Sequence, residues 1–391
     1  MISTNTNWDA KNALMAKQPI YAMEIAGQTT VYTTADLAAA GVTGTLPTYQ
    51  PWLMTPQGAA QSIDPVQARS TLGELQCDVV DVGGAIRTLV GTTVLGGETL
   101  TLLAGWPGIA WSEFVVVQTY QIYKIVPASG YGRWTFYARD WQLLTKKTLA
   151  VHPENGGLLT QDNPWYLSGT PCEIVQALAL YGLGLDAGRL DIDGIQALDS
   201  PTEGIYSPWR PFLFALTEPF TVLQFLETEI FKPSGLYAVV TPEGKISLRS
   251  WRPPAAGVSP VFAFDQDNMT KLPEIDRLEV VNEVVFRYDY DGSAYEQEVY
   301  FLEATSLTTY GRTTQWVVES KGLRSEWGAY GFAQWAAGRL FRRLAGTPTG
   351  LRGGAPVLDI EAFLMTLPVW VGDLVTLTHP LMPDLMTGRW G

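Results

Sequence analysis

The chain has 391 residues, of which 46% are hydrophobic and 12% aromatic, so it is long enough for two or three globular domains and too apolar to be disordered. Its 26 basic and 39 acidic side chains give a formal net charge of −13, which argues against a surface that grips nucleic-acid phosphates or docks on an anionic membrane. Its two cysteines, Cys77 and Cys172, are far apart and form no CxxC motif, which argues against a disulfide framework or a cysteine-built metal site.

The sequence contains no apolar run of 18 residues, and its start has no apolar core of signal-peptide length. We therefore expect two buried free thiols, no membrane anchor, and folding in a cytoplasm.

Residues 1–150 are predicted to be mostly strand. The exceptions are a helix over residues 7–17 and a short turn of helix in GGAIRTLV. In RWTFYAR, for example, Trp134, Phe136 and Ala138 alternate with polar residues and share one face. Many strands joined by glycine-rich turns, with little helix, predict a β-barrel or a sandwich.

Residues 151–260 are predicted to form an acidic α+β domain, since residues 151 to 240 contain eleven acidic side chains and three basic ones. One helix is expected in TPCEIVQALALYG, where Thr170 and Glu173 have the spacing of a capping box. A second is expected in EPFTVLQFLETEIF, followed by a hairpin of GLYAVV and KISLRSW. The run RPPAAGVSP, residues 252–260, is the predicted linker.

Strands return in residues 261–391, interrupted by one helix in SEWGAYGFAQWAAGRLFRRLAG with Ser325 as its expected N-cap. By the order of their elements, 1–150 and 261–391 look like two versions of one strand-rich unit. Arg339, Arg342 and Arg343 lie near the end of this helix. There they complement the helix dipole, or contact another subunit.

The run VVFRYDYDGS offers either paired carboxylates or a strand that ends in a tight turn. A calcium loop starting at Asp289 would need an acidic residue or Asn at 293 and Glu at 300, where this chain has Ser293 and Tyr300. Alternation instead predicts a hairpin with Asp291 and Gly292 as its turn residues, and Asp289 as a surface acid that faces a lumen or a neighbouring subunit. The predicted cross-strand pairs are Tyr290 with Ser293, Tyr288 with Tyr295, Arg287 with Glu296, and Val284 with Val299.

No catalytic, cofactor-binding or metal-binding residue is predicted. His152 and His379 each precede a proline and have no recognisable nucleophile beside them. Glu218, Glu227 and Glu229 are the acids that a glycosidase-type mechanism would use, but their spacing favours a solvated helix face.

Several of these segments together resemble the hub and tail-tip proteins of tailed bacteriophages. The C-terminal ones are EVVNEVVFRYDYDGSAYEQEV, the helix end AAGRLFRRLAGTP and LPVWVGDLVTLTHP. The others are STLGELQCDVVDVGGAIRTLVG, TLTLLAGWPG and LYAVVTPEGKISLRSW. The resemblance spans nearly the whole chain and rests on turns, strand faces and glycines.

This resemblance implies a mainly β fold with α+β inserts: two tail-tube-like β-barrel domains, 1–150 and 261–391, joined by the smaller domain 151–260. It implies a homotrimeric, non-enzymatic hub at the distal end of the tail, assembled in the host cytoplasm. The six barrels would match a sixfold tail tube to a threefold tip and let DNA pass transiently. Implied partners are a distal tail or tail tube protein, a tape measure protein, and tail fibres or spikes, and another segment would complete the barrel beyond Gly391.

Some tail-tip hubs bind an iron–sulfur cluster, but the two separate cysteines predict no cofactor here. Two other functions remain open. The 14 Trp and 17 Tyr residues would suit a carbohydrate-binding receptor module. A peptidoglycan hydrolase would use Glu218 with Glu227 or Glu229.

Overall fold

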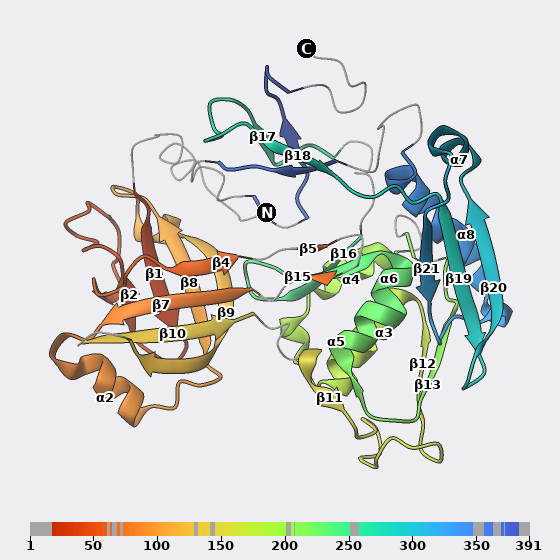
Figure 1. The fold of residues 1–391 in the computed structure, drawn as a ribbon. Helices are drawn as coiled ribbons and strands as arrows, with labels where there is room; N and C mark the ends of the chain where they lie inside the picture. The colour runs from red at the N-terminus through yellow and green to blue at the C-terminus, as the bar shows by residue number, and fades with distance from the viewer. Residues whose placement is uncertain are drawn as a thin grey trace.

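A computed structural model describes residues 18–60, 63–64, 69–70, 73–128, 132–140, 145–200, 205–206, 208–250, 258–346, 356–362, 369–370 and 372–382. The helix predicted over 7–17 and the linker residues 252–257 lie outside these ranges. Within them the fold is mixed, with more strand than helix, and comprises one eight-stranded sheet, one three-stranded sheet and six two-stranded sheets (Figure 1).

The N-terminal region consists of one large sheet, seen in red to yellow in Figure 1, in the order β3-β2-β1-β8-β9-β10-β7-β4. Its neighbours pair antiparallel except β2 and β3. The strands are β1 (Ile20–Ile25), β2 (Thr30–Thr33), β3 (Thr48–Gln50), β4 (Gln57–Ala60), β7 (Glu74–Val80), β8 (Thr99–Gly105), β9 (Val115–Pro127) and β10 (Arg133–Arg139). The pair β5 (Ile63–Asp64) and β6 (Arg69–Ser70), the 3₁₀ turns η1 (Val82–Gly84) and η2 (Trp111–Glu113), and helix α2 (Ala85–Thr92) complete it.

Alternating side chains of this sheet fill two cores, one on each face. Phe136 and Ala138, which alternation predicts on one face, are fully buried, and they pack there with Leu75, Cys77 and Val79. The opposite face packs under the loops that follow β2 and β8, around Trp106. A sheet buried on both faces is the framework of this region.

No sheet closes into a barrel by a continuous strand ladder within the described residues, so the expected pair of closed barrels is replaced by one curled open sheet and several small ones. The two sides of the large sheet are nevertheless joined by the segment between β3 and β4. The Leu53 amide donates to the Thr33 carbonyl of β2 at 3.1 Å, the Met54 amide to the Asp78 carbonyl of β7 at 2.8 Å, and the Val80 amide to the Trp52 carbonyl at 2.8 Å. Alternation predicts strands, but it does not predict whether short edge strands will pair.

The middle region is α+β, as predicted. Its strands are β11 (Thr148–Leu149), β12 (Trp165–Gly169), β13 (Phe212–Leu216), β14 (Phe220–Thr221), β15 (Leu236–Val240) and β16 (Ile246–Ser250). Its helical segments are α3 (Pro171–Ala177), η4 (Leu178–Gly182), η5 (Ala187–Arg189), α4 (Ile192–Asp199), α5 (Val222–Phe225), η6 (Leu226–Phe231) and α6 (Lys232–Ser234). The predicted capping box of α3 is confirmed: the Glu173 amide donates to Thr170 Oγ1 at 3.1 Å, and the Thr170 amide donates to Glu173 Oε2 at 2.9 Å.

The C-terminal region divides into separate parts. The three-stranded sheet β20-β19-β21 is made by β19 (Glu283–Tyr290), β20 (Tyr295–Leu302) and β21 (Gln315–Glu319), with α7 (Ala304–Tyr310), η7 (Ser325–Trp327) and α8 (Ala329–Leu344). The pairs β17–β23 and β18–β22 are made by β17 (Phe262–Phe264), β18 (Glu274–Arg277), β22 (Pro356–Asp359) and β23 (Val375–Leu377).

One hydrophobic core joins the middle region to the three-stranded sheet. It runs in sequence from Leu149 to Leu344 and includes Phe212, Phe286 and Phe332, all fully buried. Helix α8 contributes a run of small residues to this core, including Ala333 and Ala336, which lets neighbouring elements approach closely. In the described part of the chain, no helix has the length and apolar character needed to cross a membrane.

Candidate functional site

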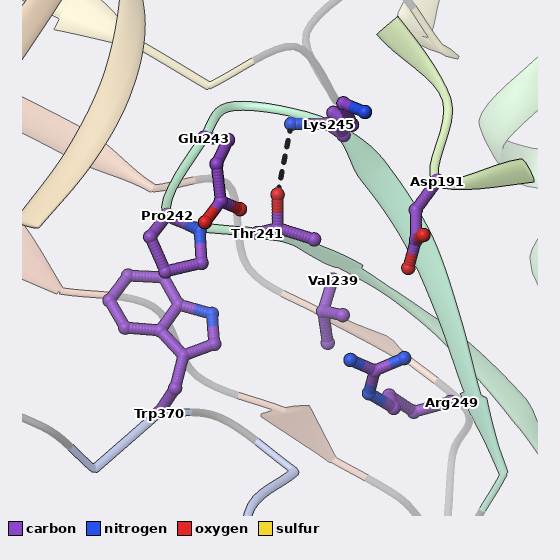
Figure 2. Close-up of a pocket in the computed structure, with 8 residues that line it drawn as sticks. All are labelled: Asp191, Val239, Thr241, Pro242, Glu243, Lys245, Arg249 and Trp370. Atoms are coloured by element: carbon purple, nitrogen blue, oxygen red, sulfur yellow. Dashed lines mark hydrogen bonds between the residues drawn. The ribbon is translucent and has the colours of Figure 1, made fainter. Parts of the chain in front are cut away.

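A hollow of about 270 Å³ lies at the tip of the β15–β16 hairpin, where three regions of the molecule meet (Figure 2). Its lining residues come from the start of α4, from both strands and the turn of the hairpin, and from the segment that precedes β23. They are Asp191, Val239, Thr241, Pro242, Glu243, Lys245, Arg249 and Trp370. We refer to this hollow as the hairpin pocket.

One wall of the hairpin pocket is a chain of hydrogen bonds that runs through a buried hydroxyl. Ser247 Oγ donates to Asp191 Oδ2 at 2.6 Å and accepts from Arg249 Nη1 at 3.1 Å. Asp191 Oδ1 accepts from the Gly194 amide at 3.1 Å, which makes Asp191 the N-cap of α4. Both carboxylate oxygens of Asp191 are therefore engaged within the chain, and the guanidinium of Arg249 is held in place.

The opposite wall is apolar and is formed by Trp370 beside Pro242 (Figure 2). The indole N–H of Trp370 donates to the Val240 carbonyl at 3.0 Å, and its backbone N–H donates to Asp373 Oδ2 at 2.8 Å. The ring also packs against the core under the loops of the N-terminal sheet. Trp370 thus fixes the C-terminal segment to both other regions.

The hairpin turn itself abuts the N-terminal sheet. Gly244 has a φ of +82°, and a Cβ there would lie 2.8 Å from the Cβ of Thr119 on β9. Both the backbone conformation and the close approach require glycine at this position. The pocket therefore combines an oriented arginine, a second cation at Lys245, exposed Glu243 and an apolar wall, which suits it to binding a small polar molecule.

The predicted hairpin turn exists, but its predicted register is wrong. Asp291 and Gly292 lie in the connection between β19 and β20, and Tyr290 pairs with Tyr295 instead of Ser293. Asp291 Oδ1 accepts from the amides of Ser293 and Ala294, both at 2.7 Å, so the connection is a four-residue loop. These backbone donors hold the pKa of the Asp291 carboxyl below its ordinary value.

The shift of register is two residues, so every side chain keeps its predicted face. Arg287 consequently pairs with Glu298 instead of Glu296, and its guanidinium also reaches Glu319 at 2.7 Å. The resulting ion-pair network crosses all three strands of the sheet.

Asp289 has a specific structural contact within the chain. It is the one described residue other than glycine with a positive φ, +55°, and its carboxylate accepts from the amide of Ser325 at 2.8 Å and from the Ser325 hydroxyl. Ser325 therefore does not cap α8 as predicted. The helix begins after Gly328, whose left-handed backbone forms the N-cap.

The three arginines predicted at the end of α8 lie in different environments. Arg339 is buried, donates to the Ser234 carbonyl, and lies over the Trp335 ring at 5.2 Å. It supplies a cation where α6 ends, and its burial lowers its pKa. Arg343 is half-buried and Arg342 is exposed, so the prediction of a subunit contact now applies best to Arg342.

The acids weighed for glycosidase chemistry are separated by environment. Glu218 is exposed. Glu229, in contrast, is not on a solvated helix face: its Oε2 accepts from the Lys321 amide at 2.6 Å, and burial raises its pKa. Glu229 thus joins η6 to the segment that follows β21, and its carboxylate is used inside the fold.

The histidines and cysteines are also engaged or buried. His152 Nδ1 accepts from the Glu154 amide at 3.2 Å, and His379 Nδ1 accepts from the Leu381 amide at 3.1 Å. Cys77 and Cys172 are buried free thiols, as predicted, and burial raises the pKa of Cys77 to about 12. Among the described residues, no three His, Cys, Asp or Glu side chains are grouped as metal ligands would be.

Sequence reasoning did not identify the hairpin pocket. Its residues are spread from Asp191 to Trp370, and each segment by itself has an ordinary structural explanation. The sequence TPEG predicts a tight turn, and LPVWVGDL contains the tryptophan of the pocket. Neither segment indicates that the two lie together in the fold.

No family model matches the chain, and no curated protein sequence matches it. Three solved structures of tail proteins are similar to it. A tail protein from Neisseria meningitidis MC58 has 12% identity and a TM-score of 0.48, with 92% of this chain and 86% of that one covered. The 43 kDa tail protein of prophage MuSo2 from Shewanella oneidensis has 11% identity and a TM-score of 0.38, with 82% and 79% covered.

The third is prophage tail protein gp18 from Listeria monocytogenes EGD-e, with 10% identity, a TM-score of 0.34, and 63% of this chain and 62% of that one covered. All three TM-scores lie below 0.5.

Proposed function

We propose that this chain is a structural protein of a phage tail, forming the central hub at its distal end. In this role three copies would adapt the sixfold tail tube to a threefold tip, and DNA would pass through them. The role is non-enzymatic and places the chain in the virion.

The observation that supports this most strongly is the joining of the two sides of the eight-stranded sheet through Trp52, Leu53 and Met54. A sheet whose two sides are linked in this way is curved, although its strand ladder stays open. This curvature supports the tail-tube-like unit that the sequence resemblance implies for residues 1–150. In the ring, each copy would contribute this unit and the strand-rich residues 261–391.

Charge is compatible with the passage of DNA. The chain carries −13 overall, and a channel lined by acidic residues would repel phosphates instead of holding them. The three-stranded sheet presents an exposed acid of this kind, Glu296, near the start of β20. These strands are therefore our candidates for the lining.

The small C-terminal sheets support assembly with other proteins. Two-stranded sheets are marginal alone, and here they leave Ile275, Val357 and Leu272 between 40% and 48% exposed. A neighbouring protein would cover these side chains. Candidate neighbours are further copies of the chain, a distal tail or tail tube protein, the tape measure protein, and fibres or spikes.

Electron microscopy of intact particles labelled with antibody against this chain tests the proposal. We expect label at the tail tip, a ring of three copies in a reconstruction, and a trimer of the purified protein by light scattering. Label on the capsid, or a purified monomer that binds neither tail tube nor distal tail protein, would overturn it. A peptidoglycan zymogram is expected to show no clearing.

A further inference from the structure

We propose that the hairpin pocket binds a single sugar ring that carries an acidic group, either a carboxylate or a phosphate. This inference concerns a different part of the molecule from the proposed hub role and does not depend on it. Size, polar groups and the apolar wall each support it.

The size of the pocket limits its ligand. Sites for drug-sized molecules usually measure roughly 300–1,000 Å³. At about 270 Å³ the hairpin pocket is slightly smaller than these. It therefore has room for one ring and not for a chain of several, unless the remainder extends into solvent.

Arg249 supplies the group that would recognise an acid. Its Nη1 is held by Ser247 Oγ at 3.1 Å and by the Leu248 carbonyl at 3.3 Å, which fixes the plane of the guanidinium. A guanidinium has five N–H donors, and no described protein acceptor takes one from Nη2 or Nε. These donors match a carboxylate or phosphate in a two-point contact, and Lys245 adds a second cation at the rim.

The two carboxylates of the pocket do not offset these cations equally. Both oxygens of Asp191 already accept a hydrogen bond, from the Gly194 amide and from the Ser247 hydroxyl, and these donors stabilise part of its negative charge within the chain. Glu243 is exposed at the turn and can accept from hydroxyl groups. An anion with neighbouring hydroxyls satisfies the cations and Glu243 together.

The wall opposite Arg249 suits a ring. Trp370 is held by its N–H bond to the Val240 carbonyl and by packing on the N-terminal sheet, so its indole is positioned before a ligand arrives. Pro242 extends the same apolar surface (Figure 2). The apolar C–H face of a sugar can pack on this surface while its polar edge faces Arg249.

The experiment is a titration of the whole protein, monitored by calorimetry and by tryptophan fluorescence, with glucuronate, glucose 6-phosphate, glucose, acetate and inorganic phosphate. We expect the two acidic sugars to bind at least tenfold more tightly than glucose, acetate or phosphate. The preferred acidic sugar then identifies the class of the acidic group.

Two variants test the assignment to this pocket. Arg249→Gln should weaken binding of the acidic sugars by about tenfold or more, because a charged hydrogen bond is lost. Lys245→Gln, at an exposed position that leaves the fold intact, should weaken binding severalfold. Arg133→Gln, which removes an exposed arginine from the N-terminal sheet, should change nothing.

Three outcomes would overturn the proposal. Equal binding of phosphate and glucose 6-phosphate would mean that the pocket takes an adventitious ion only. Equal binding of glucose and glucuronate would mean that the pocket does not recognise the acidic group. The third outcome is that no sugar binds. All three leave the hub role untouched, because its test is the position of the chain in the particle.

Discussion

The N-terminal and C-terminal regions are both rich in strands, yet they are stabilised differently. In the N-terminal region, strands β1–β4 and β7–β10 form one eight-stranded sheet with a core on each face. The C-terminal strands are divided among three sheets, and the largest of these shares its core with the helices of the middle region. The same alternation of side chains therefore gives an independent unit in one case and dependent parts in the other.

The difference lies in what the strands are paired with. In the N-terminal region, neighbours such as β8, β9 and β10 have at least seven residues each, so long ladders form. In the C-terminal region β17, β22 and β23 have three or four residues and pair across more than 75 positions of sequence. Short ladders add little stability by themselves, so these strands depend on their surroundings.

The largest expected effect would show whether the two regions unfold separately. Phe136→Ala and Phe332→Ala each remove a fully buried ring, and each should cost about 3–5 kcal/mol. Phe136→Ala should loosen only the N-terminal sheet, whereas Phe332→Ala should loosen the middle region together with β19–β21. Hydrogen exchange of the amides in β10 and β19 measures this. Equal loss of protection in both strands for both variants would contradict separate cores.

A somewhat smaller effect is expected where the middle region meets α8. Gly235 has a φ of +64°, and a Cβ there would lie about 2 Å from the Arg339 guanidinium. Gly235→Ala should displace a buried charge from its carbonyl and cost about 3 kcal/mol. Gly311 has the same φ with nothing within 4 Å, so Gly311→Ala should cost only about 1 kcal/mol. Similar melting temperatures for the two variants would show that displacing the Arg339 guanidinium does not destabilise the fold.

The next prediction concerns the cap of α3, inside the shared core region. The Thr170 hydroxyl accepts from the Glu173 amide and donates to the Asp199 carboxylate, whose pKa burial raises. Thr170→Ala should cost about 1–2 kcal/mol in urea unfolding, and Thr170→Ser, which keeps the hydroxyl, a few tenths. The loss should appear in the same transition that Phe332→Ala affects. A loss in the N-terminal transition would break the distinction between regions.

The smallest effect is the pH response of the β19–β20 hairpin. Because backbone amides lower the pKa of Asp291 in the folded chain, its contribution to stability is present above its ordinary pKa and is lost as pH falls through the lowered value. The Ala294 amide should therefore shift in NMR spectra only at pH below the ordinary Asp range, and Asp291→Asn should remove the shift. A midpoint at the ordinary value would show that the loop contact is absent in solution.

Local features of the fold could be predicted from sequence because their causes are local. The capping box at Thr170 and Glu173 and the buried face of Phe136 and Ala138 follow from spacing alone. The hairpin at Asp291 was predicted with the correct faces and the wrong loop length. The sequence DGS is compatible both with a two-residue Asp-Gly turn and with the observed four-residue loop, in which the Asp291 side chain accepts from backbone amides. No neighbouring residue favours one over the other.

Features that depend on distant segments could not be predicted. The sequence predicts Ser325 as a helix N-cap. Instead, both its amide and its hydroxyl donate to the carboxylate of Asp289, 36 residues away. The spacing of Glu229 predicts a solvated acid, but the amide of Lys321, 92 residues away in the sequence, donates to its carboxylate. The hairpin pocket is the extreme case, because its two walls come from separate regions of the chain.

The position of Trp370 also has a mechanical consequence. A pulling force on the C-terminal segment would first load the pair β17–β23 and then, through one indole ring, the Val240 carbonyl and the N-terminal sheet together. The force would then be shared between the hairpin and the N-terminal sheet and would not unfold α8 turn by turn. Displacement of this one ring would therefore release the segment from the hairpin and from the N-terminal sheet in a single step.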